Sequence, residues 1–470
     1  MIGLKKEPIN RSVKRKTVVF DRFFTENTIS DGAAALGLTG GTNSSLLLNG
    51  ALCAKTSCNC DFSGKALKPC VGAEIYYTTA GNSITTLQAD SVKNIFCVRL
   101  QGSDGMPFER YLFAWSNGFV RLYSEESRSF VLGVPVGDNV RGVYLRSVDG
   151  EERFLIVGSE KSMFFKSDEA FYPSGYSNLT SVLCVCKNRL FVVLQDGRLA
   201  YSDPSVPWDI SESIDNGGYV KLPPAYGQPI ELIAVGEYVY VFFLHAIMRL
   251  TVKGSAREFF LEEISYNGGK IIKGTICALS DGAVFLTNDG ELWTVKKKDA
   301  QPLCKDLSLY LKRQETGYRA AVYKGKYFLH YKNVKASVRS IVVDLDGGSW
   351  SNCFDLGALS TVEGAPLFVR SGTLYQLGSE VLLAGEPCTF ESVETDFGMR
   401  GRKILRRVDL SGHGTITLKV YCDGQFTRHS VSFLEGRASV VLNARGENFS
   451  FHVEIGSRSY LRSMSVELEG

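Results

Sequence analysis

From about residue 92 onward, short apolar runs alternate with short polar breaks along the chain. Most runs are four to seven residues long, as in Ile95–Leu100, Tyr111–Trp115 and Phe119–Tyr123. This length is typical of buried β-strands and is too short for most helices. Because the runs come in sets of three or four, we interpret each set as a meander of antiparallel strands.

The sets recur at a spacing of roughly 40 to 50 residues, which is the period expected of β-propeller blades. The first runs of the later sets are Val143–Leu145, Val182–Val185, Leu232–Val235, Ile276–Leu279 and Ala320–Tyr323, and a shorter set ends near Leu374–Leu377. In three sets, two runs are separated by Asn117-Gly118, Asp196-Gly197 or Asp289-Gly290. These dipeptides tolerate positive φ angles, so we predict a two-residue primed turn at each.

A single meander cannot bury both of its faces, and it leaves two strand edges unpaired. Packing successive sheets face to face around an axis removes both problems. We therefore predict an all-β fold in which residues 91–385 form a six- or seven-bladed β-propeller, with a long open β-sandwich as the alternative. One helix is expected at Leu303–Lys312, where Leu303, Leu307 and Leu311 share one face.

Beyond a boundary near Leu383–Pro387, apolar and polar residues alternate strictly. The apolar positions of two such runs are Ile416, Leu418, Val420, Phe449, Phe451, Val453 and Ile455. Strands with one buried and one solvated face are typical of antiparallel sandwiches. We predict a C-terminal antiparallel β-sandwich module over residues 386–470.

Residues 1–90 lack this rhythm, and we predict that they form an extended N-terminal arm with loops. The basic residues at its start are Lys5, Lys6, Arg11, Lys14, Arg15 and Lys16. They fit either a solvated tail or an arm that contacts an acidic partner or DNA phosphates. Such an arm can become ordered on a neighbouring subunit.

The composition narrows the class of protein. The 53 basic and 50 acidic residues leave a net charge of +3, which demands neither nucleic acid nor an anionic membrane as partner. No apolar run reaches the roughly 18 residues of a spanning helix, and the basic N-terminus lacks the apolar stretch of a secretory signal. We expect synthesis in a cytoplasm, where most of the 12 cysteines stay reduced.

Motifs for catalysis are missing. The chain has no Gly-x-Ser-x-Gly elbow, no phosphate-binding Gly-rich loop, no dinucleotide fingerprint and no His-Glu-x-x-His. Its five histidines are scattered along the sequence. We therefore expect a structural or binding protein, with no catalytic residues and no catalytic cofactor.

One cysteine group stands apart from the rest. Cys53, Cys58, Cys60 and Cys70 fall within eighteen residues of a loop-rich stretch, and four thiolates can hold a structural zinc ion. Their spacing differs from the paired Cys-x2-Cys of zinc ribbons. Plain loop cysteines, or disulfides formed after release from the cell, are the alternatives.

The segment Thr287–Trp293 partly matches the Asp-box turn of sialidase-type propellers, but Gly290 follows Asp289 directly and Leu292 stands where a Thr is usual. A tight hairpin with Trp293 packed beneath it explains the same residues. The alternative function that it raises is a glycan-acting propeller, either a glycosidase or a lectin. A glycosidase needs two carboxyl groups gathered at one mouth of the ring.

Three stretches resemble virion β-propellers of tailed bacteriophages and the sandwich module that often follows them. They are Gly197–Pro204 with Val206–Asp209, Glu237–Phe243 with His245–Leu250, and Arg406–Leu410 with Ile416–Gly424 and Arg445–Phe451. By length and layout the chain resembles the tail-hub or packaged-DNA-stabilisation proteins of short-tailed phages, and their nozzle proteins are similar in kind. The resemblance covers roughly residues 90–470.

The resemblance implies a ring-shaped homo-oligomer, expected to be a hexamer, below the portal and its adaptor. Such a tail hub or nozzle retains packaged DNA, anchors fibres or spikes, and lets the genome pass on ejection without sequence-specific binding. It is assembled in the host cytoplasm and resides in the virion tail. A cellular propeller scaffold that binds other proteins is a further alternative.

Overall fold

The computed structural model describes residues 15–20, 22–24, 51–62, 66–85, 87, 91–101, 105–166, 171–210, 217–304, 307–311, 316–333, 335, 338–360, 365–378, 382–383 and 385–470. The chain divides into two compact units. The terminal unit comprises Met1–Gly72, Ser349–Asn352 and Glu380–Gly470, and the repeat unit comprises Ala73–Gly348 and Cys353–Ser379. The expected domain boundaries at residues 90 and 385 remain predictions.

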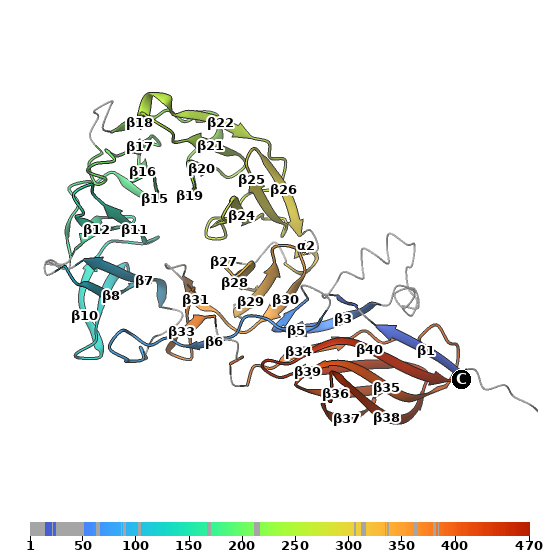
Figure 1. Ribbon diagram of the computed structural model, residues 1–470. Helices are drawn as coiled ribbons and strands as arrows, with labels where there is room; N and C mark the ends of the chain where they lie inside the picture. The colour runs from blue at the N-terminus through green and yellow to red at the C-terminus, as the bar shows by residue number, and fades with distance from the viewer. Residues whose placement is uncertain are drawn as a thin grey trace, which may run out of the picture. The chain divides into compact units, whose positions relative to one another are not determined.

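The repeat unit is built from successive antiparallel sheets, which Figure 1 shows following one another from the cyan β7 to the orange β31–β33. Sheet 1 contains β7 (Val92–Gln101), β8 (Pro107–Trp115), β9 (Phe119–Ser124) and β10 (Ser129–Pro135). Sheet 2 contains β11 (Arg141–Arg146), β12 (Glu152–Val157), β13 (Ser162–Phe165) and β14 (Tyr172–Pro173). Sheet 3 contains β15 (Leu179–Cys186), β16 (Arg189–Leu194), β17 (Leu199–Tyr201) and β18 (Gly218–Val220).

The later sheets repeat this plan. Sheet 4 contains β19 (Glu231–Val235), β20 (Tyr238–Phe242), β21 (Ile247–Thr251) and β22 (Phe260–Ile264). Sheet 5 contains β23 (Cys277–Ala278), β24 (Gly282–Leu286), β25 (Leu292–Lys296) and β26 (Asp299–Cys304). Sheet 6 contains β27 (Thr316–Tyr323), β28 (Lys326–Lys332) and β29 (Val338–Asp344). Sheet 7 contains β31 (Gly357–Ser360), β32 (Leu367–Arg370), β33 (Thr373–Leu377) and β6 (Ala73–Ile75).

Neighbouring sheets share apolar side chains. Residues of sheets 1 and 2 form one hydrophobic cluster, and the pairs 2 and 3, 3 and 4, and 4 and 5 do the same. Contacts of β23 with β27 and of β27 with β31 continue the series. A further cluster joins sheet 7 to sheet 1, and β31 contacts β7. These shared clusters explain why the inner strands read as nearly continuous apolar runs, since both of their faces are covered.

Turns occur at all three predicted Asn-Gly and Asp-Gly positions, but they are not of the predicted primed type. Gly118, Gly197 and Gly290 have positive φ, whereas the Asn or Asp before each one does not. Each glycine N–H donates to the carbonyl three residues earlier, as in Gly197 to Leu194 at 2.9 Å. This is a type I turn closed by a left-handed glycine. Two positive φ angles in succession occur instead at Lys187-Asn188, between β15 and β16.

Helical segments are few in the described part of the chain. They are η2 (Pro224–Tyr226), η3 (Ala256–Glu258) and α2 (Leu307–Tyr310). The predicted helix over Leu303–Lys312 was wrong at its start, because Leu303 lies in β26. Lys312, at its predicted end, lies outside the described residues. Leu307 and Leu311 are buried as predicted. No helix in the described residues has the length and apolar character needed to cross a membrane.

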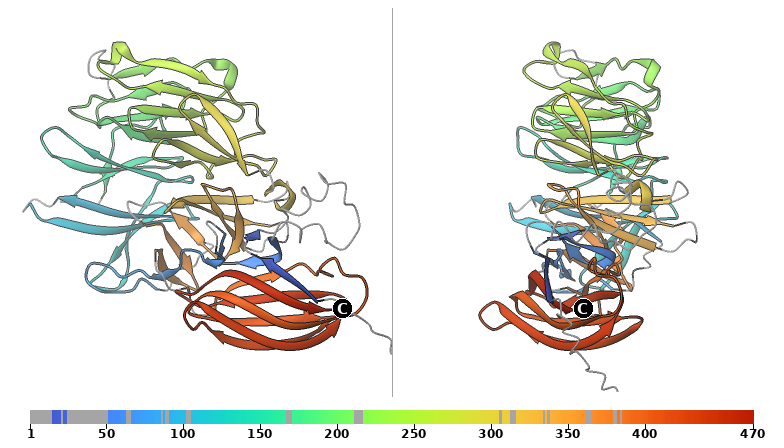
Figure 2. Two further views of the ribbon diagram at one scale, coloured as in Figure 1. Left: turned by 45° about the vertical axis from the view of Figure 1, so that its right-hand side comes forward. Right: turned by 90° about the vertical axis from the view of Figure 1, so that its right-hand side faces the viewer.

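The terminal unit contains two sheets, whose orange and red strands Figure 2 shows from two directions. The first sheet contains β1 (Arg15–Phe20), β40 (Tyr460–Glu469), β35 (Lys403–His413) and β38 (Arg437–Gly446). The second contains β30 (Trp350–Cys353), β3 (Ala51–Cys58), β34 (Cys388–Ser392), β39 (Phe449–Ile455), β36 (Thr415–Cys422) and β37 (Gln425–Ser432). Outside this order, β2 (Arg22–Phe24) pairs in parallel with β3, and β4 (Cys60–Asp61) pairs with β5 (Lys68–Pro69).

Both sheets of the terminal unit contribute to one hydrophobic cluster. The predicted alternation is confirmed, because Ile416, Leu418 and Val420 of β36 are buried and the residues between them are not. Phe20 of β1 is also fully buried and lies in the same cluster. Residues early in the chain therefore supply both strands and core to this unit.

Phe449 and Phe426 form a matched pair that tests this core. Phe449 of β39 is fully buried, whereas Phe426 of β37 is 56% exposed. We expect Phe449→Ala to lower the free energy of unfolding by about 3–5 kcal/mol, because it removes buried area and leaves a cavity. Phe426→Ala should cost less than about 1 kcal/mol. Urea unfolding measures both, and equal losses would contradict the burial assignment.

Candidate functional site

Three of the four cysteines expected to bind zinc have described side chains. Cys58 ends β3, Cys60 begins β4, and Cys70 follows β5, while the side chain of Cys53 lies outside the described residues. In the described part of the chain, no three His, Cys, Asp or Glu side chains gather closely enough to hold a metal ion. A zinc site that includes Cys53 stays a prediction.

Cys60 has a different neighbour, which the sequence spacing did not suggest. Its Sγ lies 3.4 Å from the Sγ of Cys388 and 3.0 Å from the carbonyl oxygen of Thr389. Both thiols are buried in the core of the terminal unit. Burial raises the pKa of Cys388 well above its usual value, so the thiol stays protonated and unreactive.

The Asp-box-like segment lines an open hollow of about 470 Å³. Asp289, Glu291 and Trp293 face this hollow. The indole N–H of Trp293 donates to Glu291 Oε2 at 3.0 Å, and the ring of Tyr266 meets Trp293 edge-on. Trp293 is only 5% exposed and belongs to the hydrophobic cluster of sheets 4 and 5, so the interpretation as a tight hairpin with Trp293 packed beneath it is confirmed.

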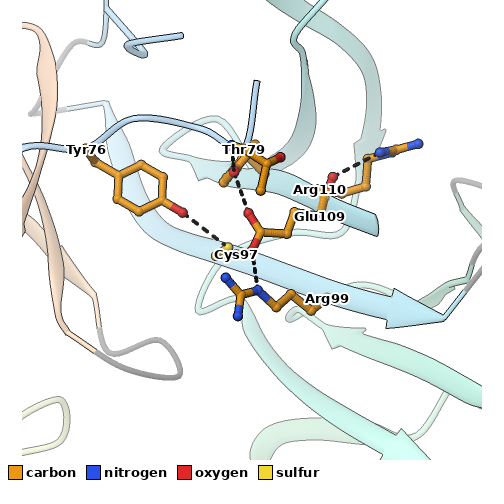
Figure 3. A network of polar contacts seen from close by, with 7 residues as sticks. Tyr76, Thr79, Cys97, Arg99, Glu109 and Arg110 are labelled. Carbon is orange, nitrogen blue, oxygen red and sulfur yellow. Dashed lines mark hydrogen bonds and ion pairs between the residues drawn. The ribbon is translucent and has the colours of Figure 1, made fainter. Parts of the chain in front are cut away.

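A larger pocket of about 700 Å³ lies against β7 and β8 in the repeat unit. Figure 3 shows the polar network at this place. Arg99 comes from β7, Glu109 and Arg110 come from β8, and Thr79 follows β6. Glu109 and Tyr111 are two residues apart on one strand, so their side chains emerge on the same face.

Glu109 is the centre of the network. Its carboxylate accepts a hydrogen bond from the Tyr111 hydroxyl at 2.7 Å and pairs with Arg99 Nε. The Glu109 side chain is only 8% exposed, whereas the side chain of Arg99 is 70% exposed. The carboxylate therefore already has two partners from the strands that form the pocket.

Tyr111 lines the pocket, and Tyr76 packs against it. The backbone N–H of Thr79 donates to the Tyr111 hydroxyl at 3.2 Å, and the Tyr76 hydroxyl lies 3.7 Å from Cys97 Sγ. The two phenol rings meet edge-on at 5.9 Å. Burial, assisted by the hydrogen bond to Glu109, raises the pKa of Tyr111 to about 12. Burial also raises the pKa of Tyr76, so both phenols are neutral at ordinary pH.

The remaining lining of the pocket is also rich in charged side chains. Arg110 reaches the backbone oxygen of Glu109 at 2.9 Å and stacks over Phe108. Glu125 and Glu126 add acidic groups at the opposite wall. The sequence did not mark this site, because Thr79 and Tyr111 are 32 residues apart and meet only in the folded chain.

One group has the residue types of a catalytic triad but not its geometry. His330 Nδ1 lies 3.4 Å from Ser340 Oγ and 3.6 Å from Asp355 Oδ1. A triad needs serine and carboxylate on opposite ring nitrogens, whereas here the same nitrogen faces both. Ser340 is buried and accepts a hydrogen bond from the N–H of Leu356. These residues stabilise the fold of sheet 6.

Comparison with known proteins adds little. No protein-family model and no curated protein matches the chain. Among solved structures, BBS1N in complex with ARL6DN has 10% identity and a TM-score of 0.43 over 65% of this chain and 96% of that chain. U3-55K has 11% identity and a TM-score of 0.39 over 63% and 98% of the two chains. BamB from Moraxella catarrhalis has 11% identity and a TM-score of 0.35 over 69% and 97%. Similarities at this level assign no function.

The pKa of Tyr111 predicts a defined loss of stability in alkali. An unfolded tyrosine ionises near pH 10, and Tyr111 in the folded protein does so only near pH 12, so the folded state loses stability as pH rises between these values. The difference in unfolding free energy between the wild type and Tyr111→Phe should shrink across this window by about 2 kcal/mol.

Urea unfolding at several alkaline pH values measures this difference. Tyr77→Phe is the matched control, because Tyr77 is 59% exposed and lies two residues before Thr79, which lines the same pocket. Its difference from the wild type should stay constant with pH. Parallel curves for the wild type and Tyr111→Phe would contradict the assigned environment of Tyr111.

Proposed function

We propose that the seven sheets of the repeat unit close into a β-propeller with seven blades. Support comes from the apolar clusters between neighbouring sheets, and from the cluster that joins sheet 7 to sheet 1. β6 lies early in the chain and pairs with β33, the last strand of the unit. Such pairing of a distant strand fastens the first and last parts of a ring together.

We further propose that the terminal unit is an antiparallel β-sandwich. Its two sheets share one hydrophobic cluster, and their strands alternate buried and accessible residues. In this proposal β1 and β3 belong to the sandwich, so part of the predicted arm serves as its framework.

We propose that the protein is a structural component of a tailed-phage virion, a tail hub or nozzle below the portal and its adaptor. The proposal is supported by where the stretches that resemble such proteins lie in the fold. Their residues pack inside the sheets and so belong to the framework of the protein. Trp208 packs under the guanidinium of Arg153 at 3.8 Å, and Tyr240 and Ile247 are fully buried. The same holds for Leu418 and Phe451 in the terminal unit.

In this role the protein acts as a rigid frame. We propose that it forms a homo-oligomeric ring, with the hexamer as the expected order, which is assembled in the host cytoplasm and incorporated into the tail. The ring helps to retain packaged DNA, anchors fibres or spikes, and gives the DNA a path on ejection. No step of this role requires catalysis, which is consistent with a Glu109 that two donors already occupy.

A glycan-binding role is the second candidate, and one observation favours it. Asp289, Glu291 and Trp293 line an open hollow in which the indole ring is held by Glu291. Asp289 and Glu291 supply carboxylates there, which suit the hydroxyl groups of sugars. Glycan binding is compatible with a place in the virion. The virion proposal and the glycan proposal therefore differ in which of these two roles is the main one.

Glu74 tests the closure by β6. Tyr76 N donates to Leu374 O, so the alternation of the antiparallel ladder directs the N–H of Glu74 toward Gln376. We expect Glu74→Pro to remove this donor and destabilise the repeat unit by about 1–3 kcal/mol. Glu74→Ala keeps the N–H and, at this exposed position, should change little. Thermal unfolding with hydrogen exchange measures both, and an unchanged Pro variant would contradict the closure.

Mass and location test the virion role. We expect light scattering to give a closed ring of about six times the 51.8 kDa chain, either alone or with a portal-side partner. Cryo-electron microscopy of the native particle should show the chain in the tail. A strict monomer under both conditions, or turnover of a glycan panel that is lost in Glu291→Gln, would overturn the proposal.

A further inference from the structure

A group of charged side chains lies where the first strands of several sheets meet. Arg141 begins β11 of sheet 2, and Glu231 begins β19 of sheet 4. Arg141 Nη2 forms an ion pair with Glu231 Oε2, although the whole of sheet 3 lies between these two residues in the sequence. The pair therefore spans from one first strand to another across β15, which contacts both.

Two more cations belong to the same place. Lys273 lies in the segment that leads into β23 of sheet 5, and Arg319 lies in β27 of sheet 6. The charges of Glu231 and Arg141 both act on Lys273, and the charge of Arg141 acts on Arg319. β19 contacts β23, and β23 contacts β27, so the first strands of sheets 4, 5 and 6 are neighbours. Three cations and one carboxylate therefore lie on, or next to, the first strands of four sheets, and we call these four residues the axial cluster.

The axial cluster has more positive than negative charge. The Glu231 side chain is only 3% exposed and is already paired with Arg141. Neither the Lys273 nor the Arg319 side chain has a hydrogen bond or ion pair with any residue that the structure describes. Lys273 and Arg319 therefore remain as two cations that have no carboxylate partner among the described residues.

The surroundings of Arg319 and Lys273 make their unpaired positive charges unfavourable for the stability of the fold. Desolvation, followed by repulsion from Arg141, lowers the pKa of Arg319 to about 10. Desolvation also lowers the pKa of Lys273. Both side chains nevertheless keep some accessible surface, so an ion from solution can reach them. Uncompensated charge of this kind destabilises a fold unless a counter-charge is supplied.

We propose that Arg141, Lys273 and Arg319 bind a small oxyanion of the phosphate class, with Glu231 holding Arg141 in position. Two guanidinium groups and one ammonium group suit a phosphate, because guanidinium donors match its oxygens in pairs and the ammonium adds a point charge. A multivalent anion neutralises the two unpaired cations at once. The bound anion joins sheets 2, 5 and 6, so it stabilises the repeat unit. This proposal is independent of the virion role.

Phosphate and pyrophosphate are the probes for the test, in a phosphate-free buffer of constant ionic strength. We expect each to raise the melting temperature of the wild type by several degrees at about 100 times its Kd, because a ligand that binds only the folded state stabilises it. A nucleoside monophosphate is the third probe, and it shows whether the site also accepts an esterified phosphate. Calorimetric titration supplies the affinities.

Arg319→Gln and Arg339→Gln are matched variants on sheet 6. Arg319→Gln should reduce phosphate affinity at least about tenfold, which corresponds to the loss of one charged hydrogen-bonding partner. Without phosphate, this variant should melt at or above the wild-type temperature, because it removes an unpaired cation, and phosphate should reverse that order. Arg339 is exposed on β29, and its replacement should leave the affinity unchanged.

Lys273→Gln is a second test that does not depend on how well the Arg319 variant folds. Lys273 is exposed, so its replacement leaves the core intact, and phosphate affinity should again fall. The proposal is overturned if phosphate does not raise the melting temperature of the wild type, or if chloride raises it equally. It is also overturned if Arg339→Gln loses as much affinity as Arg319→Gln.

Discussion

The structure of the repeat unit depends on the burial of both faces of each sheet. Every residue of β16 and every residue of β24 is buried, which one sheet alone cannot achieve. Each such sheet obtains its cover from the sheet before it and the sheet after it, through shared clusters of aliphatic and aromatic side chains. Full burial of a valine, leucine or phenylalanine contributes about 1.5–3 kcal/mol, so a sheet without neighbours loses most of what stabilises it.

The same requirement explains the use of the N-terminal residues. Sheet 7 has three consecutive strands of its own, and β6 pairs with β33 as the fourth. In the terminal unit, β1 pairs with β40 along six residues, and Phe20 adds a fully buried ring to the core. Segments that look unpatterned by themselves therefore complete sheets whose other strands lie hundreds of residues later.

The chemistry of the described residues follows from this framework. Arg249 and Glu262, Lys326 and Asp344, and Arg99 and Glu109 pair across neighbouring strands of single sheets, where they stabilise strand register. The pair of Arg141 and Glu231 is different, because it joins the first strands of two sheets and leaves Lys273 and Arg319 without partners. Most of the ion pairs named here thus stabilise the sheets of the repeat unit.

The sequence by itself determined the strand runs, their repetition and the alternation at Ile416, Leu418 and Val420, because burial periodicity is a property of neighbouring residues. It also located the Gly118, Gly197 and Gly290 turns, although the turn type was wrong. Only the tertiary structure decided that β6 joins sheet 7, that Cys60 meets Cys388, and that Glu109 meets Arg99 and Tyr111 beside Thr79. Arg141 and Glu231 are 90 residues apart, and no local pattern records which strands will converge. Such contacts form only when the sheets pack against one another. Which sheets pack together depends on the apolar faces of all of them, and these residues are far apart in the sequence.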